Sequence, residues 1–206
     1  MSEFINEILG KKVCILSYYY IPKLWIVMEV ASRVSKRRKV CIQGLDRVKW
    51  ELYPYSTDFN LSCDQGSYLI QFEAEEFNEK ADLITSTKRA RDNRVNYRVD
   101  KAFNNVYKAV NDEGRLHIFK LREGHVEDVS LGKEETYLIS VLSELGGEAE
   151  LRDLVNICSR KMQTDRDHVR RLVYYLREVG YLDLTKGRVS LKAERNIEGS
   201  RRLQGE

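Results

Sequence analysis

A short basic segment, residues 164–178, has the residue types and spacing that could do chemistry. Its sequence, TDRDHVRRLVYYLRE, sets arginines among apolar residues that recur at helical spacing. Arginine side chains bind phosphates and guanine edges when such a helix enters the major groove of DNA. The candidate DNA-binding residues are the polar side chains of this helix and the cations of the turn after it: Arg166, His168, Arg170, Arg171, Tyr174, Arg177, Lys186 and Arg188.

A second basic segment spans residues 88–98, KRARDNRVNYR, and combines cations with a tyrosine. This composition suits a phosphate backbone, although such segments also occur as solvated loops or helix faces. The candidates for auxiliary nucleic-acid contacts are its five cations: Lys88, Arg89, Arg91, Arg94 and Arg98.

The sequence carries no recognisable catalytic, metal-binding or cofactor-binding motif. His117, His125 and His168 are too far apart for metal-ligand spacing, and serine, cysteine and histidine form no nucleophile arrangement. We therefore expect no catalytic residue, no metal and no cofactor. The four cysteines are scattered without a CxxC pair, which predicts reduced, apolar residues of an intracellular protein.

Length and composition indicate a folded, soluble protein. The 206 residues could form one large domain or two small ones, with 42% hydrophobic and 33% charged residues and a net charge of +3. No apolar run approaches the roughly 18–20 residues that a membrane span requires. Because the start also lacks the pattern of a signal peptide, we expect a cytoplasmic protein without a membrane partner.

Residues 1–131 are expected to form an α/β domain with a mixed sheet. A strand at 13–17, a helix from Pro22 to Lys39 and a strand at 40–42 predict a βαβ unit with a parallel strand pair. Helical spacing of Val99, Phe103, Val106 and Val110 predicts a second long helix. Further strands are expected at 68–72, 81–85, 116–121 and 126–131.

Residues 132–192 are expected to form a separate α+β domain. Gly132-Lys133 marks the boundary, and three amphipathic helices are predicted at 134–145, 148–158 and 165–178. Strands at 181–184 and 188–191 then flank a turn at Thr185-Lys186-Gly187. The polar tail, residues 193–206, is expected to be frayed.

The segments EETYLISVLSELGG, ELRDLVNICSRKM and DRDHVRRLVYYLREVGYLDLTKGRVSL resemble winged helix-turn-helix domains of the MarR/ArsR type. The most specific part is the step from Leu176 to Leu182, where the third helix ends in an apolar-glycine-apolar-apolar sequence. The resemblance covers residues 134–192. It implies that 165–178 is a recognition helix and that 185–188 is the tip of a wing.

The strand–helix–strand order of residues 13–45 is laid out like the start of a RecA/RadA-like core. The position of the phosphate loop in such a core is occupied here by SYYYIPK, residues 17–23, which lacks the required glycines and the Lys-Ser/Thr pair. The resemblance therefore implies a core without nucleotide hydrolysis. An equal analogy is a Rossmann-like sensor domain fused to a winged helix, as in CRISPR-associated regulators.

Charge distribution decides which function we expect. Residues 134–192 contain ten Lys/Arg and ten Asp/Glu, but the acids gather in the first two helices and the cations in the third helix and the turn. This asymmetry favours a transcriptional regulator that reads duplex DNA, with residues 1–131 serving dimerisation, sensing or partner binding. The alternatives are a non-catalytic RecA-like accessory of DNA recombination or repair, and a winged helix used for protein contacts.

Overall fold

The structure is a computed structural model that describes residues 2–53 and 61–192. The chain divides into two compact units, Met1–Val129 and Ser130–Glu206. The first is a mixed α/β unit with a large mixed sheet, and the second combines helices with a small antiparallel sheet. The predicted tail, 193–206, lies outside the described residues.

The described residues of the first unit form two helices, two 3-10 turns and eight strands. Their bounds in chain order are α1 Glu3–Ile8, β1 Val13–Leu16, α2 Tyr20–Ser35, β2 Val40–Gln43, η1 Leu45–Arg47, η2 Trp50–Leu52, β3 Tyr68–Gln71, β4 Leu83–Ser86, β5 Val95–Phe103, β6 Val106–Asn111, β7 Leu116–Arg122 and β8 His125–Asp128.

The eight strands form one sheet in the order β2-β3-β4-β1-β5-β6-β7-β8. The first five strands of this order are parallel to their neighbours, and β5 to β8 form an antiparallel meander. The expected βαβ unit is therefore correct in its elements and wrong in its pairing. Strands β1 and β2 are not neighbours, because β4 and β3 lie between them.

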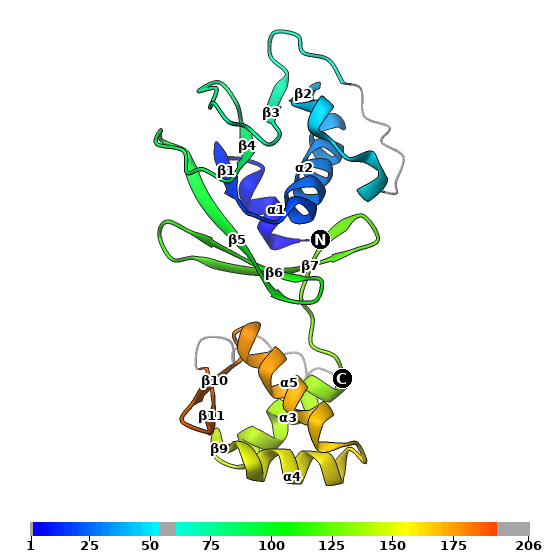
Figure 1. Cartoon of the computed structure of the whole chain (residues 1–206), viewed down its shortest axis with the longest axis vertical. Coiled ribbons are helices and arrows are strands. Elements are labelled where there is room, and N and C mark those ends of the chain that lie inside the picture. Colours follow the sequence, from blue (N-terminus) through cyan, green and yellow to red (C-terminus); the bar gives the residue numbers. More distant parts are fainter. Residues whose placement is uncertain (1, 54–60, 193–206) are drawn as a thin grey trace. The chain divides into compact units, whose positions relative to one another are not determined.

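Helices α1 and α2 pack against one face of this sheet (Figure 1). Alternate residues of β1, such as Val13 and Ile15, join Phe4 of α1 and Leu24 of α2 in one buried core. The opposite face has a smaller core around Cys14 and is covered by the segments that follow β3 and β4. The carboxyl ends of the parallel strands therefore carry the connections from which a site could be built.

The long helix expected near residues 99–110 does not form. Val99 and Phe103 belong to β5, and Val106 and Val110 belong to β6, which pairs with β5 in antiparallel register. Asn104, with φ 35°, makes the tight connection between the strands. Asparagine tolerates this left-handed conformation, so the Asn104-Asn105 pair is a turn signal that helical periodicity concealed.

The expectation of four reduced cysteines is wrong for two of them. Cys41 in β2 and Cys63 form a disulfide, with Cα atoms 4.6 Å apart. Cys14 and Cys158 are free and buried, and burial raises the pKa of the Cys14 thiol to about 11. These two residues match the expected apolar role.

The second unit has the element order helix, strand, helix, helix, strand, strand. The bounds are α3 Lys133–Glu144, β9 Glu148–Glu150, α4 Leu151–Lys161, α5 Arg166–Glu178, β10 Leu182–Thr185 and β11 Arg188–Leu191. The three strands form an antiparallel sheet in the order β10-β11-β9. The helix expected from residue 148 begins instead at Leu151, because residues 148–150 pair with β11.

Candidate nucleic-acid interface

Helix α5 is fixed at its start and along one face. The Asp165 side chain accepts a hydrogen bond from the backbone N–H of His168 at 2.7 Å, and this bond lowers the pKa of the Asp165 carboxyl. The buried face of the helix packs into the unit through four apolar residues: Val169, Leu172, Val173 and Leu176. Most of the remaining side chains of the helix, including all four arginines, are exposed to solvent.

Four of the candidate side chains form a single stripe on α5. Arg166, Arg170, Tyr174 and Arg177 follow one another at spacings of four, four and three residues, and all four are exposed. Since a helix turns by about 100° per residue, these spacings keep the four on one face. Exposed Arg171 lies about 100° farther round than Arg170.

Most cations of α5 form no ion pair with a carboxylate in the described part of the chain. Within the described residues, Arg166, Arg171 and Arg177 form no ion pair. Arg170 pairs with Asp167 at 2.6 Å on the helix surface, and His168 pairs with Glu134 at 3.0 Å. An exposed pair contributes little, so a phosphate could replace Asp167 beside Arg170.

Strands β10 and β11 carry the remaining two candidates at their tip. Lys186 and Gly187 form the two-residue turn with φ of 51° and 84°, the left-handed pair that a tight hairpin requires. Lys186 is exposed, and no described residue forms an ion pair with it. Arg188 pairs with Glu148 and Glu150 of β9, at 3.6 and 3.4 Å. Lys186 is thus the more available cation of the tip.

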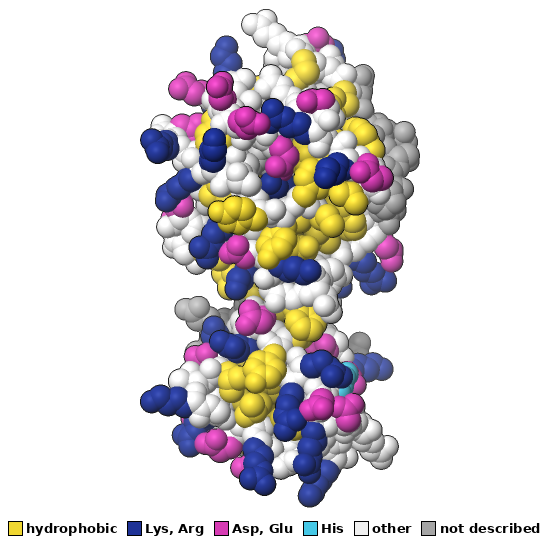
Figure 2. All heavy atoms as spheres, in the orientation of Figure 1, with side chains coloured by type: hydrophobic (Ala, Val, Ile, Leu, Met, Phe, Trp, Pro, Cys, Tyr) yellow, Lys and Arg dark blue, Asp and Glu magenta, His cyan; other side chains and the backbone are white. Residues whose placement is uncertain are grey.

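Figure 2 shows where charged side chains gather on one face of each unit. On the visible face of the C-terminal unit, Lys and Arg side chains surround an apolar group and continue along the lower part of the unit, while Asp and Glu side chains are fewer there. Tyr174 is 44% exposed and contributes apolar surface to this unit. The exposed surface thus combines cations with an aromatic ring.

The structure exposes four cations of the second basic segment and buries the fifth, Arg94, which is therefore removed from the candidate nucleic-acid contacts. The Arg94 side chain is fully buried, pairs with Asp92 at 2.6 Å and donates to the carbonyl oxygens of Ala81 and Asn78. With its donors used inside the unit, it cannot bind a phosphate. Exposed Arg89 pairs with Asp112, and exposed Arg98 with Asp100, at 3.0 and 2.9 Å; Lys88 and Arg91 are exposed without an ion pair to any described residue.

The connection between β1 and α2 lies where a RecA-like core would carry its phosphate loop, and its polar side chains are bonded to other residues of the N-terminal unit. Lys23 in the first turn of α2 is 1% exposed, and its Nζ lies 2.6 Å from Oε1 and 2.8 Å from Oε2 of Glu73. Ser17 donates to the carbonyl of Val99 and accepts from the backbone of Tyr19. The charge and hydroxyl that a phosphate would need are therefore used internally.

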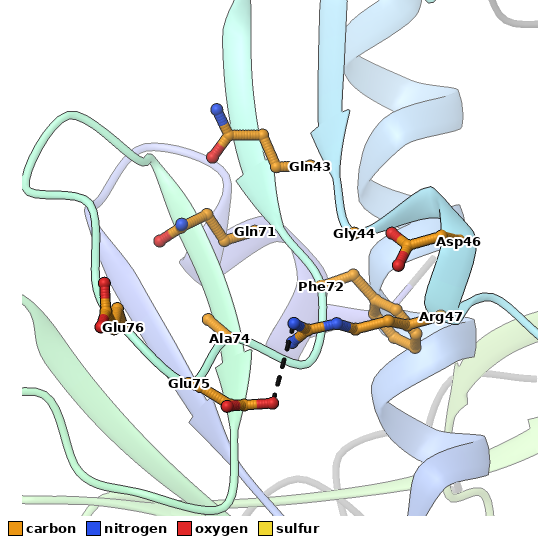
Figure 3. Close-up of a pocket in the computed structure, with 9 residues that line it drawn as sticks. All are labelled: Gln43, Gly44, Asp46, Arg47, Gln71, Phe72, Ala74, Glu75 and Glu76. Carbon is orange, nitrogen blue, oxygen red and sulfur yellow. Dashed lines mark ion pairs between the residues drawn. The ribbon is translucent and has the colours of Figure 1, made fainter.

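A polar hollow of about 360 Å³ lies at the carboxyl ends of β2 and β3 (Figure 3). Gln43 and Gln71 come from neighbouring positions of the two strands, and Arg47 reaches across to Glu75 at 3.7 Å. Asp46 and Glu76 complete a lining in which carboxylates outnumber cations. Sequence reasoning missed this hollow, although the carboxyl ends of parallel strands are where such sites form.

Each histidine of the chain faces one glutamate. His117 and Glu7 lie 2.9 Å apart in the interior, and His125 and Glu29 are 3.0 Å apart, as are His168 and Glu134. Across residues 2–53 and 61–192, no group of three or more His, Cys, Asp or Glu side chains could hold a metal ion.

No protein-family model matches the chain, and the search of curated proteins returned no significant match. None of the helices formed by the described residues has the length and apolar character needed to cross a membrane.

Proposed function

We propose that the C-terminal unit is a winged helix-turn-helix of the MarR/ArsR type that binds duplex DNA. Helix α5 would enter the major groove, and the tip of the β10–β11 hairpin would contact the adjacent backbone. The observation that carries the proposal is the exposed face of α5. Arg166, Arg171 and Arg177 form no ion pair with described residues, while the opposite face of the helix is buried.

The element order of this unit supports the winged-helix assignment. Helices α4 and α5 are separated by the short turn 162–165, and α5 leads through Gly180 into the β10–β11 hairpin. Strand β9 adds to this hairpin as the third strand of the sheet. Gly180 has φ 78°, the left-handed conformation that ends a helix. A short connection of this kind allows α4 to support α5 when α5 contacts DNA.

The biological role that follows is transcriptional regulation by occupying an operator. The N-terminal unit would then supply dimerisation, sensing or a partner contact, since many regulators of this type form dimers. DNA binding would place the protein in the cytoplasm, where disulfides are rare except in hyperthermophiles. The Cys41–Cys63 bond speaks against this location unless the protein comes from such an organism.

A second candidate function is a non-catalytic accessory of DNA recombination or repair. The observation that favours it is the Lys23–Glu73 pair, which occupies the position of a phosphate loop and leaves the N-terminal unit as a binding module. Such an accessory would bind single-stranded or branched DNA without sequence preference. The third candidate is a winged helix that contacts only protein, and exposed Leu145 and Tyr174 would serve it.

Mobility shifts with three probes separate these functions. A regulator should retain the duplex from its own upstream region at lower protein concentration than a random duplex. An accessory should prefer the single strand or a branched probe, and a protein-binding winged helix should shift none of them. Failure to shift any duplex at low salt would refute the first proposal, because cationic contacts are strongest there.

A further inference from the structure

A second hollow lies on the face of the large sheet opposite α1 and α2. It measures about 690 Å³ and is lined by Phe77, Lys88, Arg89 and Arg91. Phe77 belongs to the segment after β3, and the three cations belong to the segment after β4. Phe77 packs on the small core formed around Cys14 and Ile84. The hollow therefore combines an aromatic ring anchored on the sheet with three surrounding cations.

The cationic segment is held by its own buried side chains. Arg94 donates to Ala81 and Asn78, which ties the segment after β4 to the segment that carries Phe77. Asn96 accepts from the backbone N–H of Ala90 at 3.0 Å and donates to its carbonyl at 3.3 Å. These bonds hold the backbone that carries the cations next to the segment that carries the ring. A ligand consequently loses little affinity to ordering of this backbone.

The charges of this hollow are available to a ligand. Lys88 and Arg91 make no ion pair with any residue in the described part of the chain, and Arg89 shares a surface pair with Asp112. The hollow in Figure 3 has the opposite character, because its carboxylates outnumber its one arginine. An anionic group would therefore be attracted to the hollow lined by Phe77 rather than to the hollow shown in Figure 3.

We propose that this hollow binds an unpaired nucleotide, with the base against Phe77 and the phosphate held by Lys88 and Arg91. An aromatic ring beside phosphate-binding cations is the combination by which proteins hold single-stranded nucleic acid, since every base offers a flat face. A duplex keeps its bases stacked and cannot use the ring. The site thus goes beyond the duplex binding proposed for α5, and it stands or falls independently of it.

The test measures binding of labelled oligothymidylate to the full chain by fluorescence anisotropy. The background carries Arg166→Ala, Arg171→Ala and Arg177→Ala, so that α5 contributes little. Phe77→Leu keeps an apolar side chain on the core and removes the ring, and a second variant carries Lys88→Gln and Arg91→Gln. The matched control carries Lys80→Gln and Lys101→Gln, two exposed cations outside the lining.

We expect each hollow variant to weaken oligothymidylate binding by at least about fivefold, and the control to change it less than about twofold. Competition by thymidine monophosphate would assign the site to free nucleotides, and competition only by oligomers would assign it to a single strand. Both results support the proposal. Unchanged binding in either the Phe77→Leu or the Lys88/Arg91 variant, or equal competition by a polyglutamate peptide, would overturn it.

Discussion

At the residue scale, the ion pair between Lys23 and Glu73 determines what the β1–α2 connection can do. Glu73 adopts φ 53°, which is uncommon for a residue other than glycine, and its backbone N–H donates to Thr85 Oγ1 at 2.9 Å. Its carboxylate is directed at the buried ammonium of Lys23. Glu73 therefore holds a strained position in order to neutralise a lysine that water cannot reach.

We expect Glu73→Ala to destabilise the protein by about 3–5 kcal/mol, because it leaves the Lys23 charge buried without a partner. Adding Lys23→Met should restore much of that stability, since the double variant contains no buried charge. Urea unfolding of the two single variants and the double variant measures the coupling. Additive effects of the two changes would show that the pair does not interact.

The Glu7 side chain of α1 is the centre of a second group of interacting polar side chains. Burial raises the pKa of its carboxyl, but hydrogen bonds from Tyr97 and Lys11 and the charges of His117 and Arg115 outweigh burial, and the pKa lies below 4.5. A lowered folded-state pKa stabilises the fold above the unfolded-state value, and this stabilisation is lost as the pH falls through the folded-state pKa.

Glu7→Gln should therefore lower the free energy of unfolding by about 1–3 kcal/mol at neutral pH. The difference from the wild type should stay constant down to about pH 4.5 and shrink in more acidic solution. Urea midpoints measured from pH 7 to pH 3 test this. A difference that grows as the pH falls would contradict the assignment of Glu7 as a stabilising carboxylate.

At the element scale, amphipathic spacing predicted helices α2, α3, α4 and α5, each of which has one buried face. Helix α5 is the clearest case, because its apolar residues recur at helical spacing and a glycine follows its end. The same rule failed for β5 and β6, where Val99, Phe103, Val106 and Val110 fit a helical period by coincidence. The turn at Asn104 decides between the two, and pairing with β1 and β7 then stabilises both strands.

The disulfide belongs to this scale because it links β2 to the segment before β3. Cys41 and Cys63 are 22 positions apart, and no spacing motif marks them as partners. Alkylation of the unfolded chain without reductant should modify two cysteines, and alkylation after reduction should modify four. Reduction should also lower stability by about 3 kcal/mol, the amount expected for a loop of this length. Four reactive cysteines without reductant would contradict the bond.

At the scale of the whole molecule, the two units differ in how far apart in the sequence their contacting elements are. The C-terminal unit has mostly consecutive elements in contact, so its helices and hairpin could be predicted from the sequence. The sheet order of the N-terminal unit could not be predicted in this way, because β3 and β4 follow β1 and β2 in the sequence but lie between them in the sheet. The two hollows depend on that order and were hidden for the same reason.

The cations of α5 could be predicted, whereas their availability could not. Periodicity places Arg166, Arg170 and Arg177 on the exposed face, but only the structure separates Arg170, which is paired with Asp167, from the others. It also removes Arg94 from the candidates, since burial and hydrogen bonding depend on the distant carbonyls of Ala81 and Asn78. Sequence gives charge, and tertiary contacts decide which charges face a partner.

The central claim is that α5 contacts DNA phosphates, and the salt dependence of duplex binding tests it most directly. Arg170→Ala with Arg171→Ala is compared with a control, Lys36→Ala with Arg37→Ala, which removes two exposed cations beyond the end of α2. We predict weaker binding and a slope of log affinity against log salt that is shallower by about 1–2 for the α5 variant, with the control unchanged. A slope equal to that of the wild type would contradict the claim.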